Sequence, residues 1–69
     1  MHIEGVGAGT RVSLFICQTL ASGMTQPAYT NGEGDAYFSL DTDQFAEAEV
    51  YVNGGLAVSR SPIQDTYYI

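Results

Sequence analysis

The chain is 69 residues long, which is room for one domain with a small core and no linker. Eight acidic residues stand against two arginines and no lysine, and the net charge at pH 7 is −6. This balance excludes nucleic acid and anionic membrane surfaces as expected partners, because affinity for both comes from lysine and arginine.

Covalent and metal cross-links are not expected to stabilise this small core. Cys17 is the only cysteine, so a disulfide within the chain is excluded, and Cys17 and His2 are the only soft ligands for a zinc ion that takes four. We therefore expect no structural metal and no cofactor. A domain of this size buries only about 60% of its unfolded surface. Association with a protein partner, or with other copies of the chain, is the remaining source of stability.

No targeting or membrane-spanning segment is expected. The first residues lack the positive and apolar regions of a signal peptide. The longest apolar stretch, Val12–Cys17, is far shorter than the roughly 20 residues that cross a bilayer. A single cysteine fits a reducing compartment or a virion component made in the cytosol.

Residues 1–10 are rich in glycine, and we expect them to form a flexible lead-in or an edge strand. Arg11–Leu20 follows as a strand, with Val12, Leu14 and Ile16 on one face. The other face is partly apolar, which favours a central position in a sheet.

Residues typical of turns separate the short strands predicted in the middle of the chain. Residues 21–24 are predicted to form a turn or loop, and Gln26–Thr30 a short strand that Pro27 restricts to an edge or a strand start. Asn31–Asp35 is the clearest turn, because Asn-Gly supplies the positive φ values of a tight hairpin. Residues 36–40 return as a strand. Its inward face is expected to hold three apolar residues: Ala36, Phe38 and Leu40.

The second half continues the pattern. Residues 41–47 are predicted to form a single helical turn capped by aspartate. Ala48–Val52 alternates as a strand, and Asn53–Gly55 is a hairpin signal that joins it to Leu56–Arg60. Ile63–Ile69 is the last strand candidate. Short strands at spacings near ten residues predict an all-β fold, a small antiparallel β-sandwich of five to seven strands in one domain over residues 1–69.

Catalytic residue sets are not recognised in the sequence, and no enzymatic activity is expected. The only histidine, His2, lies near an end that we expect to fray, so no serine has a base beside it. Cys17 sits in an apolar strand, where a thiol is more often a small buried hydrophobe than a nucleophile. The glycines of residues 5–9 lack the preceding strand and following helix of a dinucleotide-binding loop.

Acidic residues in two neighbouring turns offer hard oxygen ligands. Asn31, Asp35, Asp41 and Asp43 could converge on a calcium ion. Their spacing does not match an EF-hand loop, and solvated turn residues that bind nothing are the alternative.

Tyrosine is the remaining feature of the chain. Most tyrosines fall opposite the expected core face, and this residue combines a large apolar ring with a hydrogen-bonding tip that suits interfaces. Cross-strand packing on the sheet is the alternative. The five interface candidates are Tyr29, Tyr37, Tyr51, Tyr67 and Tyr68.

Three segments carry a resemblance to a known family. Val12–Leu14 offers a Val-x-Leu strand, Thr30–Phe38 a threonine, a polar glycine turn and an aromatic strand, and Val50–Gly54 a strand that ends in glycine. In this pattern the chain resembles the carboxypeptidase regulatory-like, or prealbumin-like, β-sandwich modules. The resemblance implies a seven-stranded sandwich that serves as a non-enzymatic accessory or adhesion domain. Because this chain is short, one or two strands would be missing or supplied by a neighbour.

A second resemblance is local. Glu49–Gly54, followed by Tyr67–Ile69, is similar to hairpins of phage tail and fibre proteins, in which such strands stack in repeating assemblies. It implies a virion component. We therefore expect a non-catalytic structural or assembly protein that self-associates or decorates a larger particle through strand edges and exposed tyrosines. A carbohydrate- or calcium-binding accessory module is the alternative.

Overall fold

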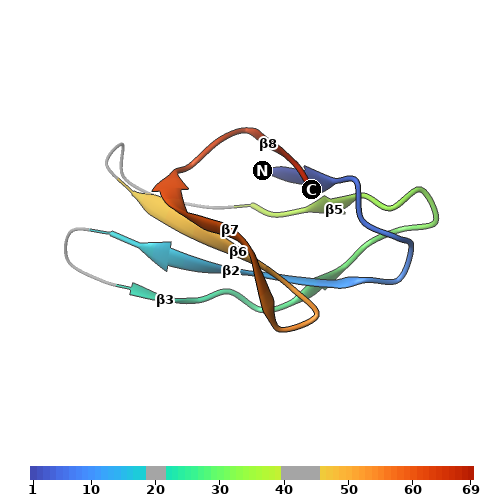
Figure 1. Ribbon diagram of the computed structural model, residues 1–69, viewed down its shortest axis with the longest axis horizontal. Helices are drawn as coiled ribbons and strands as arrows, with labels where there is room; N and C mark the ends of the chain where they lie inside the picture. Colours follow the sequence, from blue (N-terminus) through green and yellow to red (C-terminus); the bar gives the residue numbers. More distant parts are fainter. Residues whose placement is uncertain (19–21, 40–45) are drawn as a thin grey trace.

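The computed structural model describes residues 1–18, 22–39 and 46–69. These residues form eight short strands in two sheets and contain no helix (Figure 1). None of them belongs to a helix that could cross a membrane. The predicted all-β fold is confirmed. Most of the helical turn predicted over residues 41–47 lies outside the described residues, as does Leu40, but Glu47 at its end belongs to a strand.

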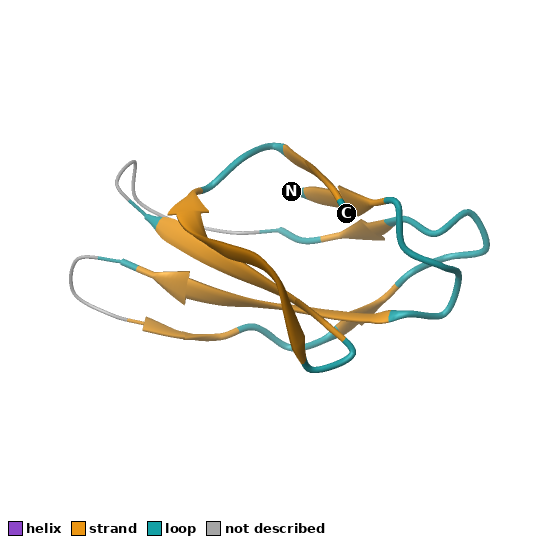
Figure 2. Ribbon diagram, viewed as in Figure 1, coloured by secondary structure: helices purple, strands orange, loops and turns teal. Residues whose placement is uncertain are grey.

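The larger sheet is antiparallel throughout and contains five strands (Figure 2). Its three long strands are β2 (Arg11–Cys17), β6 (Glu47–Val52) and β7 (Gly55–Pro62), which lie in that order. Two short strands, β3 (Ser22–Met24) and β4 (Ala28–Tyr29), both pair with β2 on the side away from β6. β2 is therefore central, as predicted, and β7 is an outer strand.

Alternating apolar residues explain why β2 and β6 pair in this register. Val12, Leu14 and Ile16 are buried, and Leu14 lies opposite Val50 while Ile16 lies opposite Ala48. Because paired residues share a face of the sheet, one register buries both apolar sets together. A shift by one residue would expose them all.

The hairpin between β6 and β7 follows the predicted Asn-Gly signal. Asn53 and Gly54 both have positive φ, of 51° and 84°. Two successive residues of this kind make the turn whose twist matches that of a hairpin. The amide of Asn53 also donates to the carbonyl of Arg11, at 2.8 Å, which fixes the turn against β2.

The smaller sheet joins distant parts of the chain. It contains β1 (His2–Glu4), β5 (Ala36–Tyr37) and β8 (Thr66–Tyr68), with β1 in the middle. β5 pairs with β1 antiparallel, and β8 pairs with β1 in parallel. The first and last strands of the chain are consequently side by side (Figure 1).

The core lies between the two sheets, so the fold is a small β-sandwich. The larger sheet contributes five buried residues, and the smaller sheet contributes three. The eight are Val12, Leu14, Ile16, Ala48, Val50, Ile3, Ala36 and Tyr67. Burial of these side chains on both inner faces is the main force that holds the sheets together.

Several local expectations were wrong. Residues 1–10 are neither a lead-in nor an edge strand as a whole, because His2–Glu4 is the central strand of the smaller sheet and Ile3 is fully buried. Ser22–Met24, predicted as a turn, pairs with β2 as β3. The described residues contain eight strands rather than five to seven. Five of these strands have only two or three residues, and one of the five, β3, carries a glycine that made it resemble a turn.

The turn at Asn31–Asp35 is confirmed, but its predicted mechanism was wrong. The residue with positive φ is Gly34, at 82°, and not Asn31. The side-chain oxygen of Asn31 accepts hydrogen bonds from the amides of Glu33 and Asp35, at 2.9 and 3.1 Å. Asparagine thus closes this turn through its side chain.

A buried threonine ties the loop after β1 to the strand before this turn. The hydroxyl of Thr30 donates to the carbonyl of Gly7, at 2.6 Å, and accepts from the amide of Thr10, at 2.8 Å. Thr30 is 5% exposed. It therefore satisfies two backbone groups where the chain passes from the smaller sheet to the larger one.

Candidate functional site

Alternation along β1, β5 and β8 gives the smaller sheet an outer face. Ile3, Ala36 and Tyr67 point into the core, and successive residues of a strand point to opposite sides. Their chain neighbours therefore point away from the core. We call this surface the outer face of the smaller sheet and define it by five residues: His2, Glu4, Asp35, Tyr37 and Tyr68.

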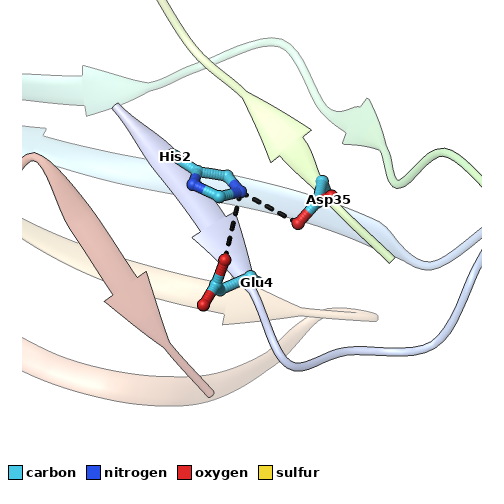
Figure 3. A group of neighbouring side chains, drawn as sticks. All are labelled: His2, Glu4 and Asp35. Atoms are coloured by element: carbon cyan, nitrogen blue, oxygen red, sulfur yellow. Dashed lines mark hydrogen bonds and ion pairs between the residues drawn. The ribbon is translucent and has the colours of Figure 1, made fainter. Parts of the chain in front are cut away.

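One histidine and two carboxylates meet on this face, and we call them the His2 cluster: His2, Glu4 and Asp35 (Figure 3). The Nε2 atom of His2 lies 2.9 Å from Oδ1 of Asp35 and 3.6 Å from Oε2 of Glu4. Ligand atoms of all three side chains lie within 4.8 Å of one another. The side chains are 25%, 34% and 17% exposed for His2, Glu4 and Asp35, so the cluster is partly screened from water.

Strand geometry explains this convergence. His2 and Glu4 are two residues apart on β1 and share its outward side. The antiparallel register places His2 opposite Tyr37 and Ile3 opposite Ala36. Continued by one residue, the same register places Glu4 opposite Asp35.

An aromatic stack holds the imidazole in place. The rings of His2 and Tyr37 are nearly parallel, with an interplanar angle of 6° and centroids 4.6 Å apart. The stack fixes the ring plane of His2 and leaves Nε2 at the ring edge, facing the carboxylates (Figure 3). Offset stacking of this kind adds to the free energy of packing.

The electrostatics of the His2 cluster favour a cation. Glu4 and Asp35 are like charges in a direct cross-strand position, which destabilises a sheet. Both arginines lie on the larger sheet, Arg11 in β2 and Arg60 in β7, where Arg60 donates to Glu47 at 3.0 Å. A protonated imidazole, or a cation shared by all three side chains, relieves the repulsion.

The five tyrosines that were predicted to lie at an interface differ in their exposure to solvent. Tyr29, Tyr37 and Tyr68 are exposed, with 65%, 65% and 78% of their surface accessible, and Tyr51 is half-buried. The prediction was wrong for Tyr67, which is 3% exposed and belongs to the core. Tyr67 lies opposite Ile3 in the parallel pair of β1 and β8, and so shares the inward side of Ile3.

The larger sheet has an outer face of its own, with a second group of tyrosines. Tyr29 pairs with Arg11 and Tyr51 pairs with Ser13, so these residues share a side of the sheet. An open pocket of about 520 Å³ lies here, lined in part by Arg11, Ser13, Thr25 and Tyr51. Such a volume is within the range of small-molecule sites.

The hydroxyl of Tyr51 donates to Oε1 of Glu49, at 3.3 Å. Partial burial, and then the negative charge of Glu49, raise the pKa of Tyr51 above its ordinary value of 10.0. Both effects disfavour the phenolate. Tyr51 therefore stays neutral in the pocket at physiological pH.

The calcium ligands predicted from the sequence are brought together only in part. The side-chain oxygen of Asn31 is engaged by two backbone amides, and Asp35 bonds to His2 instead. Asp41 and Asp43 lie outside the described residues. The calcium site stays a prediction.

Comparisons of the chain with family models, curated proteins and solved structures find no match. The resemblances to the carboxypeptidase regulatory-like modules and to phage hairpins therefore stay predictions.

Sequence reasoning missed the His2 cluster because it placed His2 at a frayed end. The backbone of Met1 is in fact tied to Phe38 twice: its α-amino group donates to the Phe38 carbonyl, at 2.8 Å, and its carbonyl accepts from the Phe38 amide, at 2.8 Å. A signal was present, since His2-Ile3-Glu4 alternates polar, apolar and polar as a strand does. Three residues are too few to separate this pattern from chance.

Proposed function

We propose that the protein is a non-catalytic structural module that associates with copies of itself, or decorates a larger particle, through a strand edge and exposed tyrosines. The observation that carries the proposal is the position of β7. This strand has eight residues, pairs with β6 on one side and is the outer strand of the larger sheet. Its other side offers backbone N–H and C=O groups to a further strand.

The distribution of apolar side chains supports the same proposal. Among the described residues, nine apolar residues are buried, but three of these are alanines. Six large apolar side chains are exposed: Met24, Tyr29, Tyr37, Leu56, Tyr68 and Ile69. The described part of the chain thus leaves exposed as many large apolar side chains as it buries. Tyrosine and methionine are enriched at protein interfaces.

Sedimentation velocity over a range of micromolar concentrations tests the proposal. We expect the sedimentation coefficient to rise with concentration above that of a 7.4 kDa monomer. Leu56→Lys, which places a charge on β7, should return the protein to the monomer, because charged residues block edge pairing. Ala8→Lys adds the same charge in the loop after β1 and should leave association unchanged. A monomer at every concentration, with no partner captured on a column of immobilised protein, contradicts the proposal.

The open pocket on the larger sheet favours a second candidate, a carbohydrate-binding accessory module. An aromatic ring from Tyr51 and polar groups from Arg11, Ser13 and Thr25 line it, which is the mix that fixes a polar ligand of modest size. Calorimetric titration with a glycan panel tests this candidate, and calcium is titrated beside it as the other predicted ligand. Heat of binding that Tyr51→Ala abolishes supports the carbohydrate site, and the absence of heat with every glycan rejects it.

A further inference from the structure

We infer that the His2 cluster is a binding site for a divalent transition-metal ion of the zinc type, held by Nε2 of His2 and one carboxylate oxygen each from Glu4 and Asp35. The inference does not depend on the proposed function. It rests on three observations that are independent of one another: the distances within the cluster, the fixed ring of His2, and the unbalanced charge of the two carboxylates.

The distances fit an ion that takes nitrogen and oxygen ligands. Zinc binds imidazole nitrogen and carboxylate oxygen at about 2.0 to 2.2 Å, so two ligand atoms on one ion lie roughly 3 to 3.6 Å apart. Nε2 of His2 lies 2.9 Å from Asp35 and 3.6 Å from Glu4. A rotation of one carboxylate about its side-chain torsions closes the remaining separation, since all three ligand atoms are already within 4.8 Å.

The site is positioned by rigid structure rather than by a loop alone. His2 and Glu4 belong to β1, the central strand of the smaller sheet, and Asp35 immediately precedes β5. The Tyr37 ring stacks on the imidazole and holds its edge toward the carboxylates. Ligands that are held in this way before the ion arrives need little ordering when it binds.

The negative charge of the cluster favours the binding of a cation. Glu4 and Asp35 face each other across two strands, and both arginines of the chain lie on the other sheet. A divalent ion would replace this repulsion with three bonds and would join β1 to β5. From the sequence we expected no zinc site because Cys17 and His2 are the only soft ligands. In the structure two carboxylates complete the ligand set, with the fourth position left to water.

The nitrogen ligand selects the metal. Imidazole suits zinc and the neighbouring transition metals, whereas calcium and magnesium prefer oxygen alone. We therefore expect zinc to bind far more tightly than calcium at this site. The selectivity also separates the His2 cluster from the calcium site predicted around Asn31 and Asp35.

Isothermal titration of the full chain with zinc chloride tests the inference. We expect one ion per chain, and we expect Glu4→Gln and Asp35→Asn each to weaken binding by at least about tenfold, since even residues behind the direct ligands have effects of that size. Glu33→Gln, which removes the same charge in the adjacent turn, is the matched control and should bind zinc like the parent protein. Zinc should also raise the melting temperature, because it binds the folded chain.

Nitrogen-15 spectra of the imidazole keep the test independent of variant stability. We expect zinc to shift the Nε2 resonance of His2 in the unaltered protein, as direct coordination requires, and equimolar calcium to leave it in place. An unshifted Nε2 resonance overturns the inference. So does a loss of affinity in Glu33→Gln equal to that in Asp35→Asn, which would reduce the effect to attraction by the acidic surface.

Discussion

The two sheets of this small sandwich are built in different ways. In the larger sheet, β2, β6 and β7 have six to eight residues each, and an Asn-Gly turn connects β6 directly to β7. In the smaller sheet, strands of two or three residues come from the start, the middle and the end of the chain. The long strands of the larger sheet and the hairpin of β6 and β7 follow from local sequence, although β2 and β6 are distant in the chain. All three strands of the smaller sheet are short, and they form a sheet only because distant segments meet.

A sheet assembled from distant segments can hold a site that no sequence motif indicates. The His2 cluster lies on the sheet that is assembled from distant segments, with two ligands from β1 and one from the turn before β5. Backbone hydrogen bonds near both chain ends join the strands of this sheet. The amide of His2 donates to the carbonyl of Asp65, and the amide of Ile69 donates to the carbonyl of Glu4, both at 2.9 Å.

The largest loss of stability is expected from a substitution in the apolar core that the two sheets share. Leu14 is fully buried on β2 and belongs to the same apolar cluster as Ile3 and Tyr67 of the smaller sheet. Leu14→Ala should lower the free energy of unfolding by about 3 kcal/mol, through lost apolar contact and a residual cavity. A domain of 69 residues has roughly 3 to 10 kcal/mol in total.

Urea denaturation followed by tyrosine fluorescence and by NMR measures this change. Because the cluster is shared, we expect one transition in which both sheets unfold together. Two separate transitions would show that the smaller sheet is stabilised independently of Leu14.

The next largest loss of stability is expected from a substitution of Gly34, in the turn before β5 of the smaller sheet. Gly34 has a φ of 82°, and a β-carbon there would collide with the carbonyl oxygen of Val6. Gly34→Ala should therefore cost about 2 kcal/mol or more, from backbone strain together with the collision. Gly32→Ala, in the same turn, meets no atom within 4 Å and should change stability by less than about 0.5 kcal/mol. Equal costs at the two positions, measured by urea denaturation, would contradict this account of the turn.

The junction between the sheets gives a smaller effect. Thr30→Val keeps the shape of the side chain but removes the oxygen that bonds to Gly7 and Thr10. The substitution leaves the amide of Thr10 without that acceptor, and we expect a loss of about 1.5 kcal/mol. Thermal unfolding monitored by circular dichroism gives the value. Thr30→Ser retains the hydroxyl and should lose clearly less, and the reverse order would argue against the hydrogen bonds.

The smallest effect concerns the outer face of the larger sheet. Glu49→Gln should lower the pKa of Tyr51, because one of the charges that raise it is removed while partial burial remains. A group whose pKa is raised on folding stabilises the protein below its unfolded pKa, near 10 for tyrosine, and this contribution is lost as the pH rises through the folded value. Absorbance titration of the phenolate, with Tyr51→Phe to assign the transition, measures the shift. An unchanged titration would mean that Glu49 does not act on Tyr51 in solution.

The sequence was sufficient where apolar alternation and turn chemistry agree. Val12, Leu14 and Ile16 were correctly predicted as one buried face, and Asn53–Gly54 was correctly predicted as a hairpin turn. Both features can be predicted from local sequence, without knowledge of the neighbouring strands.

The sequence was insufficient to predict burial where the partner strand is distant in the chain. Tyr67 and Tyr68 are adjacent tyrosines, and only the parallel pairing with β1 decides that Tyr67 is buried beside Ile3 while Tyr68 is exposed. The same pairing turns His2 from a terminal residue into part of a central strand. Ile63–Ile69 was predicted as a strand, but strands of three residues, one from each end of the chain, are too short for the sequence to indicate that they pair in parallel.

Amide hydrogen exchange at the ends of the strand pairs of the smaller sheet tests most directly the claim that the two ends of the chain come together to form the His2 cluster. We predict that the amides of His2, Phe38 and Ile69, which donate to Asp65, Met1 and Glu4, exchange more slowly than those of the exposed loop residues Gly7 and Ala8. Exchange of all three at the rate of an unfolded chain, while the amides of β2 and β6 stay protected, would contradict the account.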